Sequence, residues 1–254
     1  MRVVLISRYP RVDAAGWKRE LAQSLLDRGI DLALLYSRSS MADQARAGLK
    51  EFGLDAPRRL IAARSTPAQA GPTGSLAAWA RRQGVPVRLH RRLGDREAAE
   101  SMRALAPDLV LLTGADIVPA TLLAIPRLGT LNSHYGLMPR YRGMNATEWS
   151  IYNDDPVGVS VHFVTPGIDT GDVVAEERIE ILPGDDLERL RLRHQRAAAR
   201  LLDGAVESIA AGTVSAVAQD LSKGRQHYRM HPLLRGRVEA KLAAGAYGTR
   251  DSSR

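Results

Sequence analysis

Three polar side chains near the middle of the chain have the types and the spacing of a small acyl-transfer site. Asn132 and His134 lie two residues apart at the end of a predicted strand, so their side chains point to the same side. Asp169 lies in a turn bracketed by Gly167 and Gly171. An amide and a protonated imidazole can donate to an oxyanion, while a carboxylate keeps the imidazole charged and accepts a proton from the attacking group. This combination predicts acyl transfer without a nucleophilic side chain.

The same residues also have a plainer interpretation. Asn, Gly and Asp are common in turns, and His134 has the position of an ordinary hydrogen-bonded histidine in a core or loop. Spacing alone favours this plainer interpretation. The catalytic hypothesis therefore depends on whether the fold brings the three side chains together.

The segments around these residues alternate between strand and helix patterns. Strands are predicted at residues 3–6, 30–36, 85–89, 108–112, 129–132, 157–164 and 172–181, and helices at residues 17–25, 76–83, 98–105 and 187–209. Residues 57–74 are rich in proline and glycine and predict a loop. The alternation predicts an α/β fold with a mostly parallel, Rossmann-like sheet. Sites in such sheets gather at the carboxyl ends of strands, where Asn132 and His134 lie.

Composition limits the class of protein. With 254 residues and 44% hydrophobic residues, the chain can bury one large core with a short appendage. It contains no cysteine, which excludes disulfides, thiolate metal sites and a cysteine nucleophile. The opening apolar run is too short for a signal peptide, and no run is long enough to span a bilayer. A cytoplasmic protein that does not bind membranes is expected.

The formal net charge of +8 raises the question of an anionic partner. The basic residues are spread along the chain and interleaved with acidic ones, without a block of five or more like charges. This pattern argues against a nucleic-acid partner. Attraction to a small anionic ligand stays open.

The sequence LNSHYGLMPRYRG at residues 131–143 resembles the Asn-x-His-x-x-Leu-x-Pro-x-Tyr-x-Gly signature of folate-dependent formyltransferases. That family includes glycinamide ribonucleotide, methionyl-tRNA and amino-sugar formyltransferases. Two further segments follow in the family's order and near its spacing, GVSVHF at residues 158–163 and IDTGD at residues 168–172. Motifs in register over about forty residues are far more specific than a lone Asn-x-His pair.

The resemblance implies a role for each matching residue. Asn132 and His134 would polarise the formyl carbonyl and stabilise the tetrahedral oxyanion, and Asp169 would keep His134 charged and accept the amine proton. His162 would pack behind the site. The donor would be 10-formyltetrahydrofolate as co-substrate, with no metal. The residues implied at its pterin ring, held largely through backbone, are Ala115, Asp116, Ile117, Val118, Thr165, Pro166 and Gly167.

The chain also departs from its relatives. Tyr135-Gly136 stands where many carry Pro-Ser, and Tyr135 is either an acceptor contact or simple loop packing. Residues 8–13 lack the glycine-rich phosphate loop of glycinamide ribonucleotide enzymes, which argues against that acceptor. His227 and His231 are four residues apart, but without a third ligand a packing or surface role is expected.

These observations predict a formyltransferase catalytic domain at residues 1–184, a C-terminal helical extension at 185–244 and a disordered tail at 245–254. The expected reaction is direct transfer of a formyl group to the primary amine of a small molecule, such as an amino sugar, an amino acid or a biosynthetic intermediate. The alternatives are a formyltetrahydrofolate hydrolase, which usually carries an additional N-terminal domain, and a basic binding relative without turnover. A homodimer is an open option.

Overall fold

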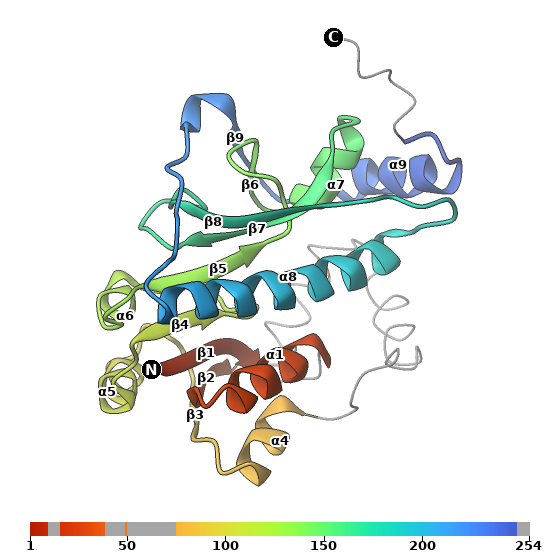
Figure 1. Ribbon diagram of the computed structural model, residues 1–254. Coiled ribbons are helices and arrows are strands. Elements are labelled where there is room, and N and C mark those ends of the chain that lie inside the picture. Colours follow the sequence, from red (N-terminus) through yellow and green to blue (C-terminus); the bar gives the residue numbers. More distant parts are fainter. Residues whose placement is uncertain (10–15, 39–48, 50–74, 248–254) are drawn as a thin grey trace.

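The computed structural model describes residues 1–9, 16–38, 49 and 75–247 (Figure 1). The loop predicted at residues 57–74 and residues 248–254 of the predicted tail lie outside these ranges. The main sheet has seven strands in the order β3-β2-β1-β4-β5-β7-β8. Its strands are β1 (Arg2–Tyr9), β2 (Asp31–Arg38), β3 (Val87–His90), β4 (Leu109–Leu112), β5 (Thr130–His134), β7 (Val157–Phe163) and β8 (Val173–Ile179).

The sheet is parallel from β3 to β5, and β7 and β8 add an antiparallel edge. This arrangement confirms the predicted α/β fold with a mostly parallel, Rossmann-like sheet. Each predicted strand is present within a few residues of its expected bounds. The strand β5 extends two residues beyond its predicted end, so that His134 belongs to the strand itself.

The helices in the described part of the chain are α1 (Gly16–Asp27), α4 (Leu76–Arg82), α5 (Arg96–Leu105), α6 (Ala120–Leu123), α7 (Ala146–Tyr152), α8 (Leu187–Ala210) and α9 (Pro232–Ala243). A second, small sheet pairs β6 (Tyr141–Gly143) with β9 (Arg225–His227), and a 3-10 turn, η2 (Leu221–Lys223), precedes β9. The C-terminal extension is therefore not entirely helical, because it contributes β9. The small sheet joins two segments more than eighty residues apart.

Successive side chains of the buried strands point to opposite faces of the sheet, and each face packs into its own hydrophobic cluster. Val3 and Leu5 of β1 pack with the helices α1, α4 and α8, whereas Val4 and Ile6 pack with α5 and α6. Successive side chains of a strand point to opposite faces, so a continuous apolar run is what a sheet covered on both sides requires. The apolar run of β1 is thereby explained.

The long helix α8 lies against the sheet across β5, β7 and β8 and beside α1 (Figure 1). The side chain of Asp186 caps its first turn by accepting a hydrogen bond from the backbone N–H of Arg189 at 2.8 Å. Its buried stripe, which includes His194 and Leu202, matches the predicted three- and four-residue spacing. Because α8 covers the strands that hold the predicted site residues, its packing stabilises that part of the sheet.

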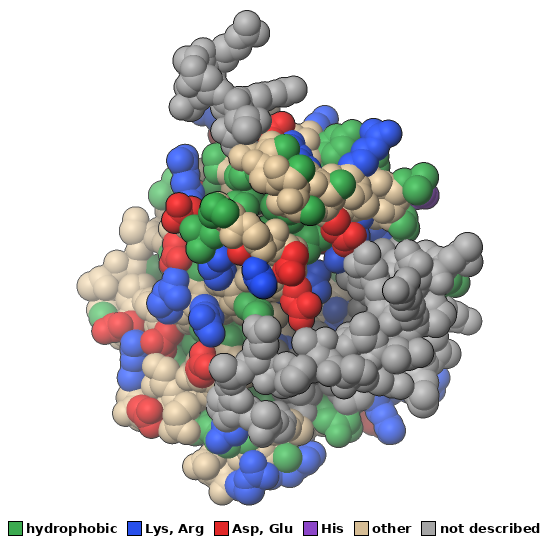
Figure 2. Space-filling model, turned by 90° about the vertical axis from the view of Figure 1, so that its right-hand side faces the viewer, with side chains coloured by type: hydrophobic (Ala, Val, Ile, Leu, Met, Phe, Trp, Pro, Cys, Tyr) green, Lys and Arg blue, Asp and Glu red, His purple; other side chains and the backbone are tan. Residues whose placement is uncertain are grey.

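Two features of the molecule concern the polarity of its helices and the distribution of charge on its surface. Within the described residues, every helix is too short or too polar to cross a lipid bilayer. On the face shown in Figure 2, Lys and Arg side chains are interspersed with Asp and Glu. That face carries no continuous basic surface over the residues described.

We predict that Leu202→Ala lowers the free energy of unfolding by about 2–5 kcal/mol, because Leu202 is fully buried between α8 and the sheet and its truncation leaves a cavity. Urea denaturation at neutral pH measures the change. Leu233→Ala is the control, since Leu233 is 76% exposed and its loss should change stability by less than about 0.5 kcal/mol. Equal effects of the two substitutions would contradict this account of the core.

Candidate active site

The sheet topology brings the predicted catalytic residues together around β5. This strand lies between β4, to which it is parallel, and β7, to which it is antiparallel. In the β5–β7 register, Asn132 lies opposite His162 and His134 opposite Ser160. Asp169 lies in the turn that joins β7 to β8 and that folds back over the same strands. The three residues that spacing alone could not unite are thus neighbours.

His134 is buried, and both of its ring nitrogens face hydrogen-bond acceptors. Its Nε2 donates to the carbonyl of Tyr141 at 2.7 Å, and its Nδ1 lies 3.4 Å from Oδ2 of Asp169. A backbone carbonyl can only accept, so the Tyr141 contact fixes a proton on Nε2. The ring is therefore held on one side by the loop that follows β5 and on the other by the Asp169 carboxylate.

His162 is a member of this cluster that the sequence placed only behind the site. Its Nδ1–H donates to the carbonyl of Phe163 at 2.7 Å, which fixes the ring. Its Nε2 then lies 3.3 Å from Nδ2 of Asn132 and 3.5 Å from Oδ1 of Asp169. His162 thus links the amide to the carboxylate. A histidine in a buried strand looks like a core residue from sequence, and only the register of β5 with β7 could have revealed it.

Asp169 is held ionised by its surroundings. Burial raises the pKa of its carboxyl, but the contact with His162, the electrostatic influence of the His134 ring and the backbone N–H of Gly143 outweigh burial and lower that pKa to about 2. The Gly143 N–H donates to Oδ2 at 2.8 Å. The backbone of Asp169 adopts a positive φ of 52°, an uncommon conformation for a residue with a side chain. The turn therefore holds a carboxylate in a fixed and strained geometry.

Burial and the neighbouring carboxylate act in opposite directions on the protonation of His134. Burial lowers the pKa of His134, and the opposing influence of Asp169 and the Tyr141 carbonyl offsets this only in part. Asp169 acts in the expected direction, yet desolvation of the charged ring is the larger effect. Asp169 thus favours the charged form of His134, as expected, while burial opposes it; the role of Asp169 in keeping His134 charged stays a prediction.

The residues expected at the pterin ring lie on two loops beside β5. Leu112 pairs with Asn132, so residues 113–118 continue past the end of β4 next to the cluster. Ile117 is 84% exposed and Val118 is buried in the core, while Asp116 accepts hydrogen bonds from Arg8 and Ser37, which tie this loop to β1 and β2. Residues 165–167 are exposed on the turn that leads to Asp169.

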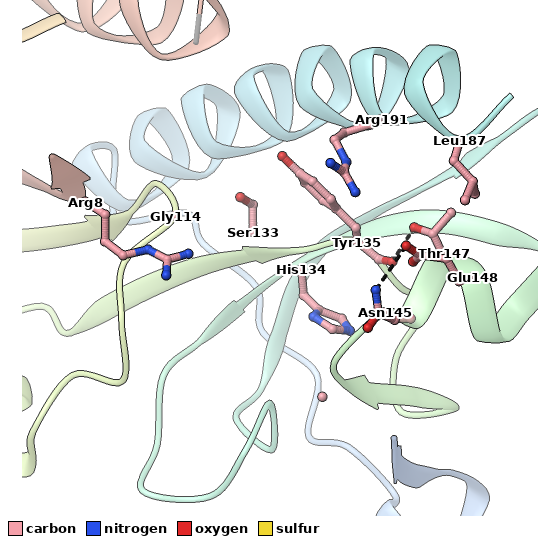
Figure 3. Close-up of a pocket in the computed structure, with 12 residues that line it drawn as sticks. Arg8, Gly114, Ser133, His134, Tyr135, Asn145, Thr147, Glu148, Leu187 and Arg191 are labelled. Carbon is pink, nitrogen blue, oxygen red and sulfur yellow. Dashed lines mark hydrogen bonds between the residues drawn. The ribbon is translucent and has the colours of Figure 1, made fainter. Parts of the chain in front are cut away.

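A pocket of about 410 Å³ opens beside His134 and extends toward α8 (Figure 3). Arg8 reaches in from the end of β1, the ring of Tyr135 extends from the end of β5 toward α8, and Arg191 points down from α8. Burial raises the pKa of Tyr135 to about 12, so its hydroxyl stays protonated. In the described part of the chain, Arg191 has no hydrogen-bond or ion-pair partner. The other residues that line the pocket are Gly114, Ser133, Gly143, Asn145, Ala146, Thr147, Glu148 and Leu187.

The structure gives packing contacts for Gly136 and for the histidine pair His227 and His231. Gly136 lies against the ring of His134 and the carbonyl of Tyr141, so that a Cβ there would collide with both. His227 is buried and stacks on the Tyr141 ring, with the two ring centroids 4.9 Å apart. His231 accepts a hydrogen bond from the backbone N–H of Leu233 and caps α9. The expected packing role of this histidine pair is therefore met.

The sequence of this site can now be compared with known proteins. The profile of the family described as "Formyl transferase" matches residues 56–206, which include every member of the cluster. The chain belongs to the formyl transferase family. It is 34% identical over 144 residues to a methionyl-tRNA formyltransferase of Trichlorobacter lovleyi, a match that covers 56% of this chain and 46% of that protein. The chain thus spans about half the length of the curated relatives it matches.

Solved structures share the formyl transferase fold with this chain. Glycinamide ribonucleotide transformylase 1 of Symbiobacterium toebii superimposes with a TM-score of 0.63 at 20% identity, covering 87% of this chain and 94% of that chain. A sugar N-formyltransferase of a Shewanella species gives a TM-score of 0.61 at 16% identity, covering 96% of this chain and 87% of that chain. Identities this low show the shared fold alone.

The lowered pKa of Asp169 predicts a pH-dependent contribution to the stability of this formyl transferase. Asp169→Asn should lower the free energy of unfolding at pH 7 by about 2 kcal/mol, because the carboxyl pKa falls from 3.8 to about 2 on folding. The advantage of the wild type is complete above the unfolded value and is lost as pH falls through the folded value.

Urea denaturation of both proteins between neutral pH and pH 2 checks this sign. Glu180→Gln is the control, since Glu180 is an exposed carboxylate without a hydrogen bond or ion pair in the described part of the chain. If the difference in the free energy of unfolding between the wild type and Asp169→Asn became larger as pH falls, the native carboxyl would not be held ionised.

Proposed function

We propose that this formyl transferase moves a formyl group from 10-formyltetrahydrofolate to the primary amine of a small molecule by direct attack. The observation that carries the proposal is the cluster at β5. An ionised Asp169 lies within 3.5 Å of two histidines, and Asn132 approaches the second of them at 3.3 Å. An amide, an imidazole and a carboxylate thus form one cluster, and His134 connects this cluster to an open pocket that it lines.

The choice of donor rests on the family and on the two loops beside β5. An N-formyltransferase of Helicobacter canadensis with the same fold is described in complex with folinic acid and dTDP-3-aminofucose. Here, residues 115–118 and 165–167 flank the cluster, with Ile117 84% exposed and residues 165–167 at the surface. The exposure of Ile117 and of residues 165–167 leaves both loops accessible to a ring held mainly by N–H and C=O groups. These two loops are our proposed pterin-binding segments.

In the proposed reaction, Asn132 and His134 polarise the formyl oxygen while the neutral amine nitrogen attacks the formyl carbon. The C=O electron pair moves to oxygen and gives a tetrahedral oxyanion, which Asn132 Nδ2–H and His134 stabilise. Asp169 stabilises the positive charge on the attacking nitrogen and relays its proton. The oxyanion then collapses, the bond from carbon to the folate nitrogen breaks, and that nitrogen takes the proton. The products are the formamide and tetrahydrofolate.

The lowered pKa of His134 suits this sequence of charges. A buried imidazolium would be costly before the donor binds, because desolvation penalises the charged form. As negative charge develops on the formyl oxygen, the proton that the attacking amine loses passes through Asp169 to Nδ1 of His134, which lies 3.4 Å from Oδ2, and the ring gives it up to the folate nitrogen when the oxyanion collapses. The ring therefore contributes most in the transition state, which is what raises turnover rather than ground-state binding.

The pocket beside His134 is proposed to bind the acceptor. Arg8 and Arg191 give it positive charge, and Tyr135 gives it an aromatic wall. This lining suits a small amine that carries an anionic group. We further propose that residues 1–184 supply the catalytic groups and that residues 185–244, which include Leu187 and Arg191, complete the pocket.

Methionyl-tRNA is a second candidate acceptor, favoured by one observation. Methionyl-tRNA formyltransferases are among the curated relatives of this chain, and their similarity to it covers slightly more than half of its length. A hydrolase that uses water as the acceptor is a third. The assay below separates the three.

Release of tetrahydrofolate can be measured by absorbance. We expect this release to require an amine, which a panel of nucleotide-linked amino sugars, amino acids, glycinamide ribonucleotide and methionyl-tRNA would identify. Asn132→Ala, His134→Asn and Asp169→Asn should each lower kcat by at least ~10², because each removes charge stabilisation from the transition state. His231→Asn and Glu180→Gln are matched controls outside the site and should keep wild-type turnover.

Two results would decide against small-molecule transfer. Release without any amine would assign a hydrolase, and release with methionyl-tRNA alone would assign the macromolecular acceptor. Full activity in all three site variants would remove the cluster from the mechanism altogether.

The acceptor pocket yields a separate prediction. Arg191→Met should raise the KM of an anionic acceptor roughly 10-fold or more, because a charge-assisted contact is lost, and should leave the KM of the folate donor unchanged. Arg196→Met on the same helix is the control, since Arg196 is exposed and does not line the pocket. Steady-state kinetics with each substrate varied in turn provide the test. An increase confined to the donor KM would contradict the assignment.

A further inference from the structure

The segment that follows α8 runs past the turn between β7 and β8 on its way to β9 (Figure 1). Val217 forms an antiparallel bridge with Val173, the first residue of β8, through two backbone hydrogen bonds of 2.9 and 2.8 Å. Val173 is four residues after Asp169, so this bridge fixes the segment beside the Asp169 turn. Residues 213–227, from the end of α8 to the end of β9, are called the crossing segment below.

Gln219, two residues after the bridge, binds the backbone of the Asp169 turn. Its Nε2 donates to the carbonyl of Asp169 at 3.1 Å and to that of Gly171 at 2.5 Å. An amide nitrogen carries two hydrogens, so one side chain satisfies both carbonyls. The turn needs such support, because Asp169 has a positive φ of 52° that an unrestrained aspartate would rarely keep.

The crossing segment also fixes the group that the Asp169 carboxylate binds. Gly143 of β6 donates its N–H to Oδ2 of Asp169 at 2.8 Å, and it pairs with His227 of β9. Gly143 has a φ of 95° and lies against the carbonyl of His227, where a Cβ would collide. The next residue, Met144, donates its N–H to that same carbonyl at 2.9 Å. Both the backbone and the carboxylate of Asp169 are thus restrained from the crossing segment.

We propose that Gln219 is a positioning residue that sets the Asp169 carboxylate against His134 and His162, and that the crossing segment thereby completes the active site. The catalytic part of this inference rests on the function proposed above. The crossing segment lies beyond residue 206, where the match to the family profile ends. Gln219 touches none of the reacting atoms and acts through Asp169 alone.

The first test needs no substrate. The charged and titratable groups that face His134 are Asp169 and His162, and Asp169 alone raises its pKa by charge. Gln219→Met should let the carboxylate move away, so the midpoint of the His134 titration, followed by NMR of labelled histidines, should fall below that of the wild type. His134→Asn identifies the resonance. Gln226→Met, an exposed glutamine of the same segment without a side-chain hydrogen bond in the described structure, should leave the midpoint unchanged.

The second test is kinetic. Gln219→Met should lower kcat on the order of 10-fold to 100-fold, the cost of a displacement of about 1 Å in a catalytic group, with the KM of both substrates nearly unchanged. In an Asp169→Asn background the same substitution should have no further effect, because Gln219 acts only through that carboxylate. Additive losses in the double variant would overturn the proposal.

The two tests separate this inference from the proposed function. An unchanged His134 titration in Gln219→Met, even with a lower Tm, would overturn the positioning role and leave only a structural one. A shifted titration in a protein that shows no formyl transfer with any amine would support the positioning role and refute the function.

Discussion

The site depends on keeping one carboxylate ionised inside the protein. A buried charge is costly unless hydrogen bonds and opposite charge compensate it. Asp169 meets this requirement with three groups from different parts of the chain: His134 of β5, His162 of β7 and the backbone N–H of Gly143 of β6. None of the three is adjacent to Asp169 in sequence. The register of the central strands and the path of the loop after β5 are therefore conditions for the chemistry.

The two ionisable groups of the site differ in when they carry charge: Asp169 is charged at rest, whereas His134 is proposed to become charged during the reaction. The low pKa of Asp169 keeps its negative charge present at neutral pH, whereas burial lowers the pKa of His134 and disfavours positive charge on the resting ring. In the proposed reaction, the ring takes the amine proton from Asp169 while the oxyanion is present and gives it up to the folate nitrogen, so the charge pair is complete only around the transition state. Asn132 supplies a neutral donor throughout. A site permanently charged on both sides would stabilise the resting protein more and the transition state relatively less.

The sequence predicts what short-range patterns encode. The apolar run of β1, the spacing of α8 and its Asp186 cap each reflect a local rule of strand or helix geometry, and the structure follows them. Asn132, His134 and Asp169 were singled out because their types suit one chemistry and the family motifs mark them, and the structure brings them together; their catalytic role stays a proposal. The contacts of His162 with Asn132 and Asp169 were not predictable from the sequence, because they depend on the register in which β7 pairs with β5. The effect of burial on the pKa of His134 was not predictable either, since desolvation depends on a burial that no local pattern reports.

The C-terminal residues of this member of the formyl transferase family show how the proposed catalytic groups and the proposed acceptor pocket can vary separately. The cluster on β5, β7 and the Asp169 turn lies inside the family match, whereas much of what restrains the pocket lies outside it. Glu148 lines the pocket, and Nη1 of Arg235 on α9 lies 3.7 Å from its carboxylate, with both side chains nearly buried. A change in α9 can therefore reshape the acceptor pocket through Glu148 without touching Asn132, His134 or Asp169. If the proposed function holds, acceptor choice in this chain is set partly by residues that make no contact with the formyl group.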